Sequence, residues 1–184
     1  LDTNVAGLQV DENGICQYCH QFDRQKSQIV LNKAEKEEEL NHHINLIKSD
    51  GSGKAYDCII GLSGGVDSSY VAWLLKQKGI RPLAVHFDNG WNTEIAVSNI
   101  ENICHKLNIE LFTYVVDWEE FKDIQLSFLK AGVANAEAPT DHGIFATLYK
   151  LANQFKLKYI VDGVNHATEF VRKDFKAAGW AYSD

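Results

Sequence analysis

One run of nine residues, G-L-S-G-G-V-D-S-S at positions 61–69, constrains this chain more than any other feature. It follows a short apolar segment at residues 56–60 and leads into an amphipathic segment at residues 70–78. A strand, a glycine turn and a helix start are therefore predicted in that order. Adjacent glycines let backbone N–H groups turn inward, and the N-terminus of a helix is electropositive. The pattern predicts a loop that binds phosphate.

The residues inside this loop narrow the kind of phosphate site. No lysine follows the second glycine, which excludes the G-x-x-x-x-G-K-[ST] loop, and the spacing does not fit G-x-G-x-x-G. Ser63, Ser68 and Ser69 add hydroxyl donors around Gly64 and Gly65, and Asp67 places a carboxylate among them. A carboxylate in a phosphate cradle makes sense when a cation such as Mg²⁺ bridges it to the phosphates. We expect ATP with Mg²⁺ here, against the alternative of a glycine-rich turn without a ligand.

The chain after residue 56 alternates short apolar runs with helical periods. We expect strands at residues 59–62, 82–88, 110–116 and 159–162, and helices at residues 68–78, 94–107, 118–130 and 142–155. Strands separated by helices of this length imply right-handed crossovers and a parallel sheet covered on both faces. The predicted fold class is therefore α/β, with a doubly wound parallel sheet.

Polar turns follow three of the predicted strands. The first is the phosphate loop, the second begins with Asp88, Asn89 and Gly90, and the third contains Gly163 and Asn165. Ordinary turn chemistry explains any one of them alone. Ligands of parallel sheets, however, bind beyond the carboxyl ends of the strands, where these turns are expected to meet. The three turns together favour one nucleotide site.

The run Pro139-Thr140-Asp141-His142 allows two interpretations that the sequence leaves equal. Thr140 or Asp141 is the N-cap of the helix predicted at residues 142–155. Alternatively, Asp141 and His142 face the cleft and bind Mg²⁺ or substrate, with His142 available as a base.

The first 24 residues read as a loop-rich segment that contains a C-x-x-C pair, Cys16 and Cys19. Such a pair after a turn is typical of a metal knuckle, and a tetrahedral zinc site needs four ligands. Histidines such as His20, His42 and His43 are candidates for the other two, but a second cysteine pair upstream of the first residue is more natural. The redox alternative needs a helix start in a βαβ pattern, which the loop does not offer. Two unligated surface cysteines are the third interpretation.

Residues 33–49 show a helical period in which Leu40, Ile44 and Ile47 share one face, beside a glutamate-rich block that we expect to be solvated. The segment 49–53 is rich in glycine and serine and is predicted to break this helix and act as a linker. We therefore predict a cysteine knuckle and helix at residues 1–50 and a nucleotide-binding domain at residues 51–184.

Composition bounds the class of protein. A net charge of −7 argues against an extended nucleic-acid surface. No apolar run approaches the ~18 residues of a membrane span and no signal peptide is visible, so we expect a cytoplasmic protein without a membrane span. Four cysteines then suggest thiols or metal ligands rather than disulfides. The chain begins at Leu1 and contains no methionine, so we expect a piece of a longer protein.

The phosphate loop resembles the pyrophosphate loop, or PP-loop, of the N-type ATP pyrophosphatases. That family cuts ATP between the α and β phosphates, transfers AMP to a substrate oxygen and releases pyrophosphate. The resemblance implies the adenine-nucleotide α-hydrolase type of sheet for residues 51–184. It also implies that Phe87, Asp88 and Asn89 contact the adenosine, and that Gly163 and Asn165 approach the ribose and the α-phosphate.

The resemblance extends to one group in that family, the N-acetyl sugar amidotransferases of bacterial surface-polysaccharide biosynthesis. Besides the loop, it rests on H-F-D-N-G-W-N at 86–92, V-V-D-W-E-E-F at 115–121, K-A-G-V at 130–133, P-T-D-H at 139–142 and G-W-A-Y at 179–182. These enzymes convert an acetamido group on a sugar into an acetamidino group, as in the synthesis of lipopolysaccharide O-antigen. The resemblance implies an ATP-dependent, ligase-type amidotransferase that forms AMP and pyrophosphate.

We expect catalytic roles for Ser63, Asp67 and Asp141, and the C-x-x-C pair predicts structural Zn²⁺ at Cys16 and Cys19. The substrate would be an acetamido sugar or nucleotide sugar. No glutaminase signature is visible, so a separate glutaminase subunit is expected to supply ammonia. Two other functions stay open. A tRNA-modifying ATP pyrophosphatase, of the thiolation or lysidine type, is disfavoured by the negative charge. A non-catalytic nucleotide-binding module is disfavoured by Asp67.

Overall fold

The structure is a computed structural model that describes residues 7–29, 33–133 and 135–164. The chain divides into two compact units, and the second runs from His42 to Val164. The described part of the first unit lies within residues 7–41. Both the phosphate loop and the strands belong to the second unit, so that unit positions the predicted nucleotide site.

The first unit contains helix α1 (Gln17–Ile29) after a short turn. Val10 and Cys16 form an isolated antiparallel bridge, and the Asp11 carboxylate accepts hydrogen bonds from the backbone N–H groups of Asn13 and Ile15, both at 2.9 Å. The prediction of a loop-rich segment through residue 24 is therefore wrong from Gln17 onward. Most residues of α1 are polar, so only a few apolar positions mark its helical period in the sequence.

Helix α2 (Lys33–Gly51) confirms the helix predicted at residues 33–49 and continues two residues further. Ile44 and Ile47 on the predicted apolar face are buried, and Leu40 is half-buried. The second compact unit begins within this helix. The two-part division at residue 50 stays a prediction.

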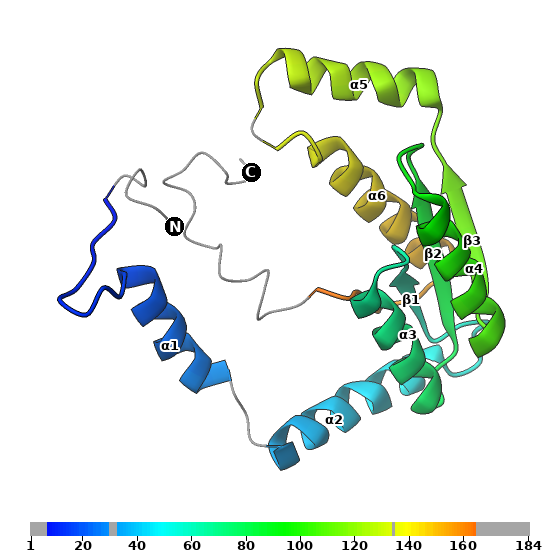
Figure 1. Cartoon of the computed structure of the whole chain (residues 1–184). Coiled ribbons are helices and arrows are strands. Elements are labelled where there is room, and N and C mark those ends of the chain that lie inside the picture. The colour runs from blue at the N-terminus through cyan, green and yellow to red at the C-terminus, as the bar shows by residue number, and fades with distance from the viewer. Residues whose placement is uncertain (1–6, 30–32, 134, 165–184) are drawn as a thin grey trace. The chain divides into compact units, whose positions relative to one another are not determined.

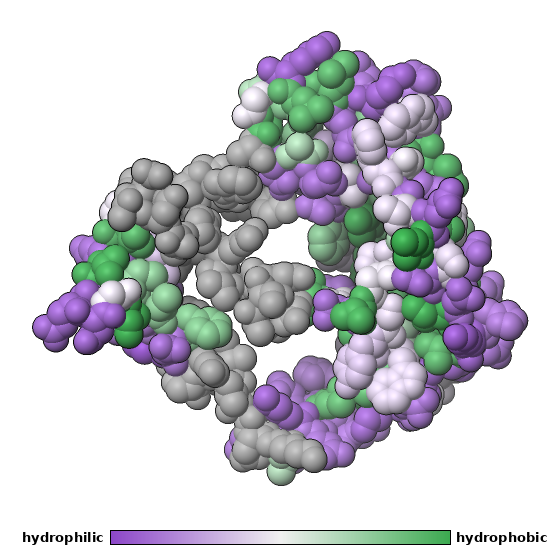
Figure 2. Space-filling model, in the orientation of Figure 1, coloured by the Kyte–Doolittle hydropathy of each residue, from purple (hydrophilic) through white to green (hydrophobic). Residues whose placement is uncertain are grey.

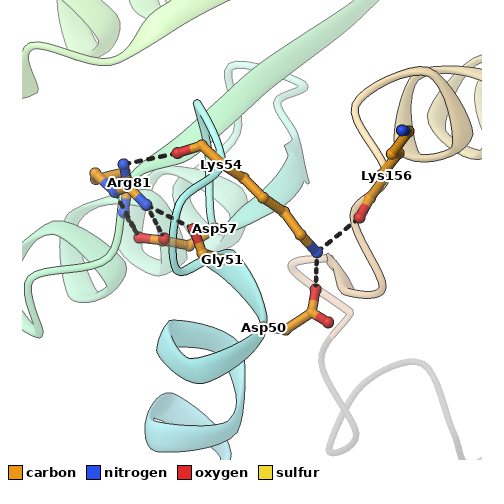
Figure 3. A network of polar contacts seen from close by, with 6 residues as sticks. All are labelled: Asp50, Gly51, Lys54, Asp57, Arg81 and Lys156. Atoms are coloured by element: carbon orange, nitrogen blue, oxygen red, sulfur yellow. Dashed lines mark hydrogen bonds and ion pairs between the residues drawn. The ribbon is translucent and has the colours of Figure 1, made fainter.

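The residues after α2 are held in place rather than loose, as Figure 3 shows. Arg81 donates from Nη2 to the carbonyl oxygen of Gly51 and from Nη1 to that of Lys54, both at 2.9 Å. Lys54 in turn donates to Asp50 and to the carbonyl oxygen of Lys156, both at 2.7 Å. The expectation of a linker at residues 49–53 is corrected, because these polar contacts tie the segment to the start of the sheet.

A four-stranded parallel sheet forms in the order β3-β2-β1-β4. Its strands are β1 (Cys58–Gly61), β2 (Pro82–Asp88), β3 (Glu110–Val115) and β4 (Ile160–Val161). Ile59 pairs with Leu83 on one side and with Ile160 on the other, so β1 pairs with a strand that lies about a hundred residues later in the chain. The predicted fold class is confirmed.

Helices pack on both faces of the central strands (Figure 1). On one face, α6 (Ala138–Gln154) covers β1 and β2. On the other face lie α3 (Val66–Gln77) and α4 (Glu94–Leu107), which contact each other. Helix α5 (Trp118–Lys130) contacts α6. The core under α6 consists of Ile59, Leu83, Val85, Leu148, Leu151, Ala152 and Leu157. Because side chains alternate along a strand, Ile60 and Ala84 face the α3 side.

The prediction that helices cover both faces of the sheet does not hold at β3. Its residues are exposed apart from the half-buried Leu111. Helix α6 packs on β1, β2 and β4. Among the more extensive contacts of the described residues, α4 is the only helix that packs on β3. Apolar side chains also reach the surface of α5, as the green atoms at the top of Figure 2 show, and Leu126 and Leu129 are exposed there.

The last predicted helix starts earlier than expected. The sequence predicts it at residues 142–155, but α6 begins at Ala138, with Pro139 in its first turn and Glu137 as an N-cap that makes no side-chain capping bond. Proline suits the first helical positions because its φ is already helical and its missing N–H would have no helical partner. Thr140 and Asp141 therefore lie inside the first turn, and the prediction that one of them is the N-cap is wrong.

No helix in the described ranges has the length and apolarity needed to cross a membrane.

Candidate nucleotide site

The phosphate loop is shaped by its close approach to α4. Gly64 has φ of +78°, and a Cβ built at this position would lie 2.5 Å from the carbonyl oxygen of Ala96. The side chain of Asn99 donates to the carbonyl oxygen of Gly64 at 3.2 Å. Only glycine meets both the conformation and the space at position 64. The loop is thus held from outside by the helix that follows β2.

The three serines of the loop differ in their roles. Ser68 is buried, and its Oγ lies 3.2 Å from Ser63 Oγ. Ser69 donates from its hydroxyl to the carbonyl oxygen of Gly65, which also accepts from the Ser69 backbone N–H at 3.2 Å. Ser63 is exposed. All three hydroxyls therefore bond within the loop, and the Ser63 side chain is also exposed at the surface.

The first turn of α3 has the character of an anion site. Its N-cap is Gly65, and no side chain caps the helix. The positive end of the helix is therefore left to a ligand or to water. Asp67 lies in this first turn with an exposed side chain. A single exposed carboxylate beside a phosphate cradle is a donor set that Mg²⁺ accepts together with phosphate oxygens, so the residues fit this ion.

The turn after β4 meets the phosphate loop directly. A Cβ built on Gly163 would lie 2.7 Å from the backbone nitrogen of Ser68 and 2.9 Å from its Cα. Asp162 Oδ1 accepts from the backbone N–H of Val164 at 3.1 Å and closes the turn. The expectation that these two turns share one edge of the sheet is confirmed. Asn165, predicted beside them, lies outside the described residues.

The turn after β2 shows the side-chain bonds of an ordered polar turn. Asp88 Oδ1 accepts from the backbone N–H of Gly90 at 3.0 Å and from Asn92 Nδ2 at 2.8 Å. Asn89 is buried, accepts from the backbone N–H of Trp91 at 3.1 Å and donates to Thr140 Oγ1 at 3.1 Å. The bond to Thr140 links the turn to the start of α6. The contact of Phe87, Asp88 and Asn89 with adenosine stays a prediction.

The residues of the P-T-D-H run lie in the first turns of α6. His142 is exposed, and its Nδ1 lies 2.7 Å from the carbonyl oxygen of Ala138, so Nδ1–H donates to that oxygen. Asp141 is half-buried. With the capping interpretation overturned, the cleft-facing role of Asp141 stays a prediction.

His86 is a residue that the sequence reasoning missed. It is 6% exposed, and its Nδ1 lies 3.2 Å from the carbonyl oxygen of Leu62, the residue before Ser63. Its Nε2 is buried without a hydrogen-bond partner among the described residues. Buried polar atoms usually have partners, so this atom is exceptional. A histidine inside an otherwise apolar strand was the signal that could have identified it.

The cysteine pair lies at the start of α1. The Sγ atoms of Cys16 and Cys19 are 3.5 Å apart. The backbone N–H of Cys19 lowers the pKa of Cys16, whereas the bond to Cys16 raises the pKa of Cys19. His20, one candidate third ligand, instead pairs with Asp11 at 2.7 Å. The described residues contain no group of three His, Cys, Asp or Glu side chains that could hold a metal ion.

The other two cysteines belong to the core. Cys58 and Cys104 are buried. Burial raises the pKa of Cys58 to about 12 and also raises the pKa of Cys104. Neither thiol is ionised near neutral pH, which agrees with their interpretation as small apolar residues.

Residues 57–168 match the family model described as Queuosine biosynthesis protein QueC. The chain belongs to this family. The match begins at Asp57, just before β1, and includes the loop and both polar turns. QueC-family membership confirms the general resemblance to PP-loop ATP pyrophosphatases. The narrower assignment to sugar amidotransferases stays a prediction.

Curated relatives of this QueC-family chain act on tRNA according to their names. It is 34% identical over 70 residues to tRNA(Ile)-lysidine synthase of Chlamydia pneumoniae, covering 37% of the chain and 22% of that protein. It is 25% identical over 119 residues to tRNA-specific 2-thiouridylase MnmA 2 of Fusobacterium nucleatum, covering 61% of the chain and 34% of that protein. The chain thus spans between about a fifth and a third of their lengths.

Solved structures support the fold. The glutamine-dependent NAD⁺ synthetase of Acinetobacter baumannii, solved with ADP, superposes with a TM-score of 0.55 at 19% identity, over 65% of this chain and 23% of that one. NMN synthetase of Francisella tularensis superposes with a TM-score of 0.51 at 19% identity, over 74% of this chain and 56% of that one. The QueC-family sheet is thus shared with these synthetases.

Proposed function

We propose that this chain is the ATP-binding catalytic part of an amidotransferase that converts the acetamido group of a sugar into an acetamidino group. The observation that carries the ATP site is the contact of Gly163 with the first turn of α3, where Ser68 lies and no side chain caps the helix. The sugar specificity rests on the extended resemblance, whose motifs run from the loop at 61–69 to G-W-A-Y at 179–182. The product would serve surface-polysaccharide synthesis.

Adenylation solves a chemical problem that this substrate presents. An amide carbon is a poor electrophile, and its oxygen is a poor leaving group. The amide oxygen attacks the α-phosphorus of ATP, the bond from that phosphorus to the bridging oxygen breaks, and pyrophosphate leaves. Ammonia then adds to the resulting imidate carbon and loses a proton. AMP departs with the former amide oxygen, so one oxygen is exchanged for one NH group.

The residues of the loop act on the phosphates in this scheme. Backbone N–H groups at residues 64–66 and the positive N-terminal end of α3 offset the negative charge that grows on the departing pyrophosphate. Ser63 donates from its exposed hydroxyl. Asp67 would hold Mg²⁺, which would supply further positive charge at the phosphates. The cradle also aligns the α-phosphorus with the attacking oxygen, and Asp141 would help to orient the acceptor.

The supply of ammonia and a structural metal site are two further parts of the proposal. A separate glutaminase subunit would supply ammonia, and the reaction would take place in the cytoplasm. Cys16 and Cys19 would supply two of four ligands to a structural Zn²⁺, with the others from elsewhere in the complete protein. Their Sγ separation of 3.5 Å is close to the spacing of about 3.8 Å that tetrahedral Zn–S bonds impose.

A tRNA-modifying ATP pyrophosphatase is the second candidate. The relatives named tRNA(Ile)-lysidine synthase and tRNA-specific 2-thiouridylase favour it. The net charge of −7 disfavours it, because RNA-binding surfaces are usually basic. Both candidates share the ATP site and differ in the acceptor.

Pyrophosphate release tests the proposal. Full-length protein with ATP, Mg²⁺ and ammonium is offered a panel of nucleotide-linked acetamido sugars, and in parallel unmodified tRNA. We expect AMP and pyrophosphate with a sugar, and a product in which mass spectrometry finds O replaced by NH. Formation of ADP, or modification of tRNA while every sugar is ignored, contradicts the proposal.

The Asp67→Ala variant tests the role of the carboxylate in the same assay. We expect pyrophosphate release to fall at least a hundredfold, on the order of the effect of one electrostatic group in a transition state. Glu101 is an exposed carboxylate on α4, so Glu101→Ala is the matched control and should keep full activity. Unchanged release from Asp67→Ala rules out the metal-bridging role.

A further inference from the structure

A cavity of about 480 Å³ lies between α5 and α6, over the ends of β2 and β3. Helix α5 lines it with Glu120, Ile124 and Phe128, which recur at the four-residue spacing of one helix face. Helix α6 lines the other side, where Gly143 and Lys150 are among the residues that recur along its length. The volume falls in the range of pockets that hold small molecules, roughly 300–1,000 Å³.

The floor of the cavity is aromatic. Phe87 and Tyr114, which are paired on adjacent strands, stack with ring centroids 5.8 Å apart and planes 3° from parallel. Phe121 meets the edge of Phe87 at 6.3 Å. A Cβ on Gly143 would lie 2.3 Å from Phe87 Cζ, so glycine at this position lets the ring lie against α6. The floor is therefore a flat apolar surface that one helix and two strands hold in place.

The charges around this floor do not suit a polyphosphate. Asp117 and Glu120 line the cavity from the α5 side, and Lys150 and His142 line it from α6. Two carboxylates face one permanent cation, so the phosphate chain of ATP would meet repulsion here. Carboxylates and an ammonium around an apolar floor suit a ligand that carries several hydroxyl or amide groups and no charge.

The cavity adjoins the nucleotide site through shared elements. Phe87 directly precedes the turn of Asp88 and Asn89, and Asn89 bonds to Thr140 beside the cavity residue Pro139. The phosphate loop and Gly163 lie at the ends of β1 and β4, whereas the cavity lies over β2 and β3. A nucleotide at the loop and a second ligand in the cavity would therefore occupy neighbouring parts of one sheet edge.

We propose that this cavity binds the acceptor, as the uncharged sugar ring that carries the acetamido group. This inference rests on the proposed function and adds where its second substrate binds. The C–H face of a pyranose packs on the paired rings of Phe87 and Tyr114, while Glu120 and Lys150 bond to its hydroxyl and amide groups. A nucleotide attached to the sugar stays outside, because its phosphates are excluded by the two carboxylates.

The test separates acceptor binding from ATP binding. Full-length protein is assayed for pyrophosphate release while UDP-N-acetylglucosamine and ATP are varied in turn. We expect Tyr114→Ala and Glu120→Gln to raise the KM for the sugar about tenfold and to leave the KM for ATP within twofold. Phe112→Ala is the matched control, because Phe112 is on the same strand and face, is 39% exposed against 38% for Tyr114, and does not line the cavity.

A binding experiment adds a readout that needs no turnover. Saturation-transfer NMR with N-acetylglucosamine should show contact with the unsubstituted protein and with Phe112→Ala, and a much weaker signal with Tyr114→Ala. Thermal unfolding of all variants identifies any that fail to fold, and Glu120→Gln changes no core contact.

The outcomes distinguish the two levels of the proposal. A higher KM for ATP with an unchanged KM for the sugar places adenine in the cavity and overturns this inference alone. The proposed function and this inference both fail if no acetamido sugar supports pyrophosphate release by the unsubstituted protein and N-acetylglucosamine gives no NMR signal with it. Sugar turnover with equal KM values in all variants overturns only the location of the acceptor.

Discussion

The carboxylate of Asp57 is surrounded by Arg81. It accepts from the backbone N–H of Arg81 at 2.7 Å, from Nε at 3.2 Å and from Nη2 at 2.6 Å (Figure 3). The Asp57 side chain is 4% exposed and that of Arg81 is 51% exposed. Asp57 precedes β1 and Arg81 precedes β2, and Arg81 also bonds to the end of α2. This pair fixes the starts of the two central strands, opposite the edge that carries the nucleotide site.

Removal of this arginine should destabilise the fold. Arg81→Ala leaves a buried carboxylate with one backbone donor, and we expect a loss of about 2–3 kcal/mol in the free energy of unfolding. This is below the ~3–5 kcal/mol for a fully buried pair, because water reaches half of the arginine. Urea unfolding measures it. Lys122→Ala, which breaks the exposed pair with Glu119, should cost at most about 0.5 kcal/mol. Equal losses in both variants would contradict the role of burial.

A second ion pair at this end of the sheet should make stability depend on pH. The bond from Lys54 lowers the pKa of Asp50 below its ordinary value of 3.8, and Lys158 adds to this. Because the folded pKa is the lower one, the stabilisation is complete above about pH 4 and is lost as pH falls through the folded value. Urea unfolding between pH 5 and pH 2 should show a smaller loss for Asp50→Asn than for the unsubstituted protein. Identical pH profiles would exclude this contribution.

An extra methyl group at Gly163 should disturb the nucleotide site. Gly163→Ala forces a Cβ to within 2.7 Å of the Ser68 nitrogen, so the start of α3 or the turn after β4 must move. We expect the affinity for ATP to fall at least tenfold, as isothermal titration would measure. Gly61→Ala is the control, since its Cβ would meet only the Leu148 side chain at 3.8 Å. An unchanged affinity for ATP in Gly163→Ala would show that the turn after β4 can move away from the start of α3 without disturbing the site.

The bond between His86 and the Leu62 carbonyl should position the phosphate loop. Asparagine can place its amide N–H near the position of Nδ1, whereas glutamine reaches toward that of Nε2. We expect His86→Asn to keep pyrophosphate release within about threefold and His86→Ala to lose about tenfold, the upper value for one hydrogen bond. His86→Gln should resemble the alanine variant. If all three lose activity in proportion to their unfolding midpoints, the histidine serves only the core.

The proposed zinc site predicts the metal content of the complete protein. Full-length protein purified under metal-replete reducing conditions should hold zinc by elemental analysis. Cys16→Ser and Cys19→Ser should lose it, because zinc thiolate sites need all their ligands. Cys104→Ala, which changes a core thiol, should retain the metal. Absence of zinc from the unsubstituted protein would refute the proposal.

Periodicity located most elements of the second unit. The predicted bounds of β2, α4 and α5 agree with the structure residue for residue. The start of α6 was misplaced because Pro139 was treated as preceding the helix, although proline is favoured in its first turn. Helix α1 was missed because its sequence is polar. The errors fall at the start of one helix and in a helix with few apolar residues.

The sequence by itself determined the class of fold and the chemistry of the loop, because alternating strands and helices and a glycine-serine-aspartate run are local patterns. The tertiary structure decided which residues meet. Gly163 contacts Ser68 only because β4 pairs with β1, nearly a hundred residues earlier. His86 and the aromatic floor of Phe87 and Tyr114 likewise depend on strand order and register. Local periodicity carries no information about which strands become neighbours, since that choice depends on how the helices bury their apolar faces on the sheet.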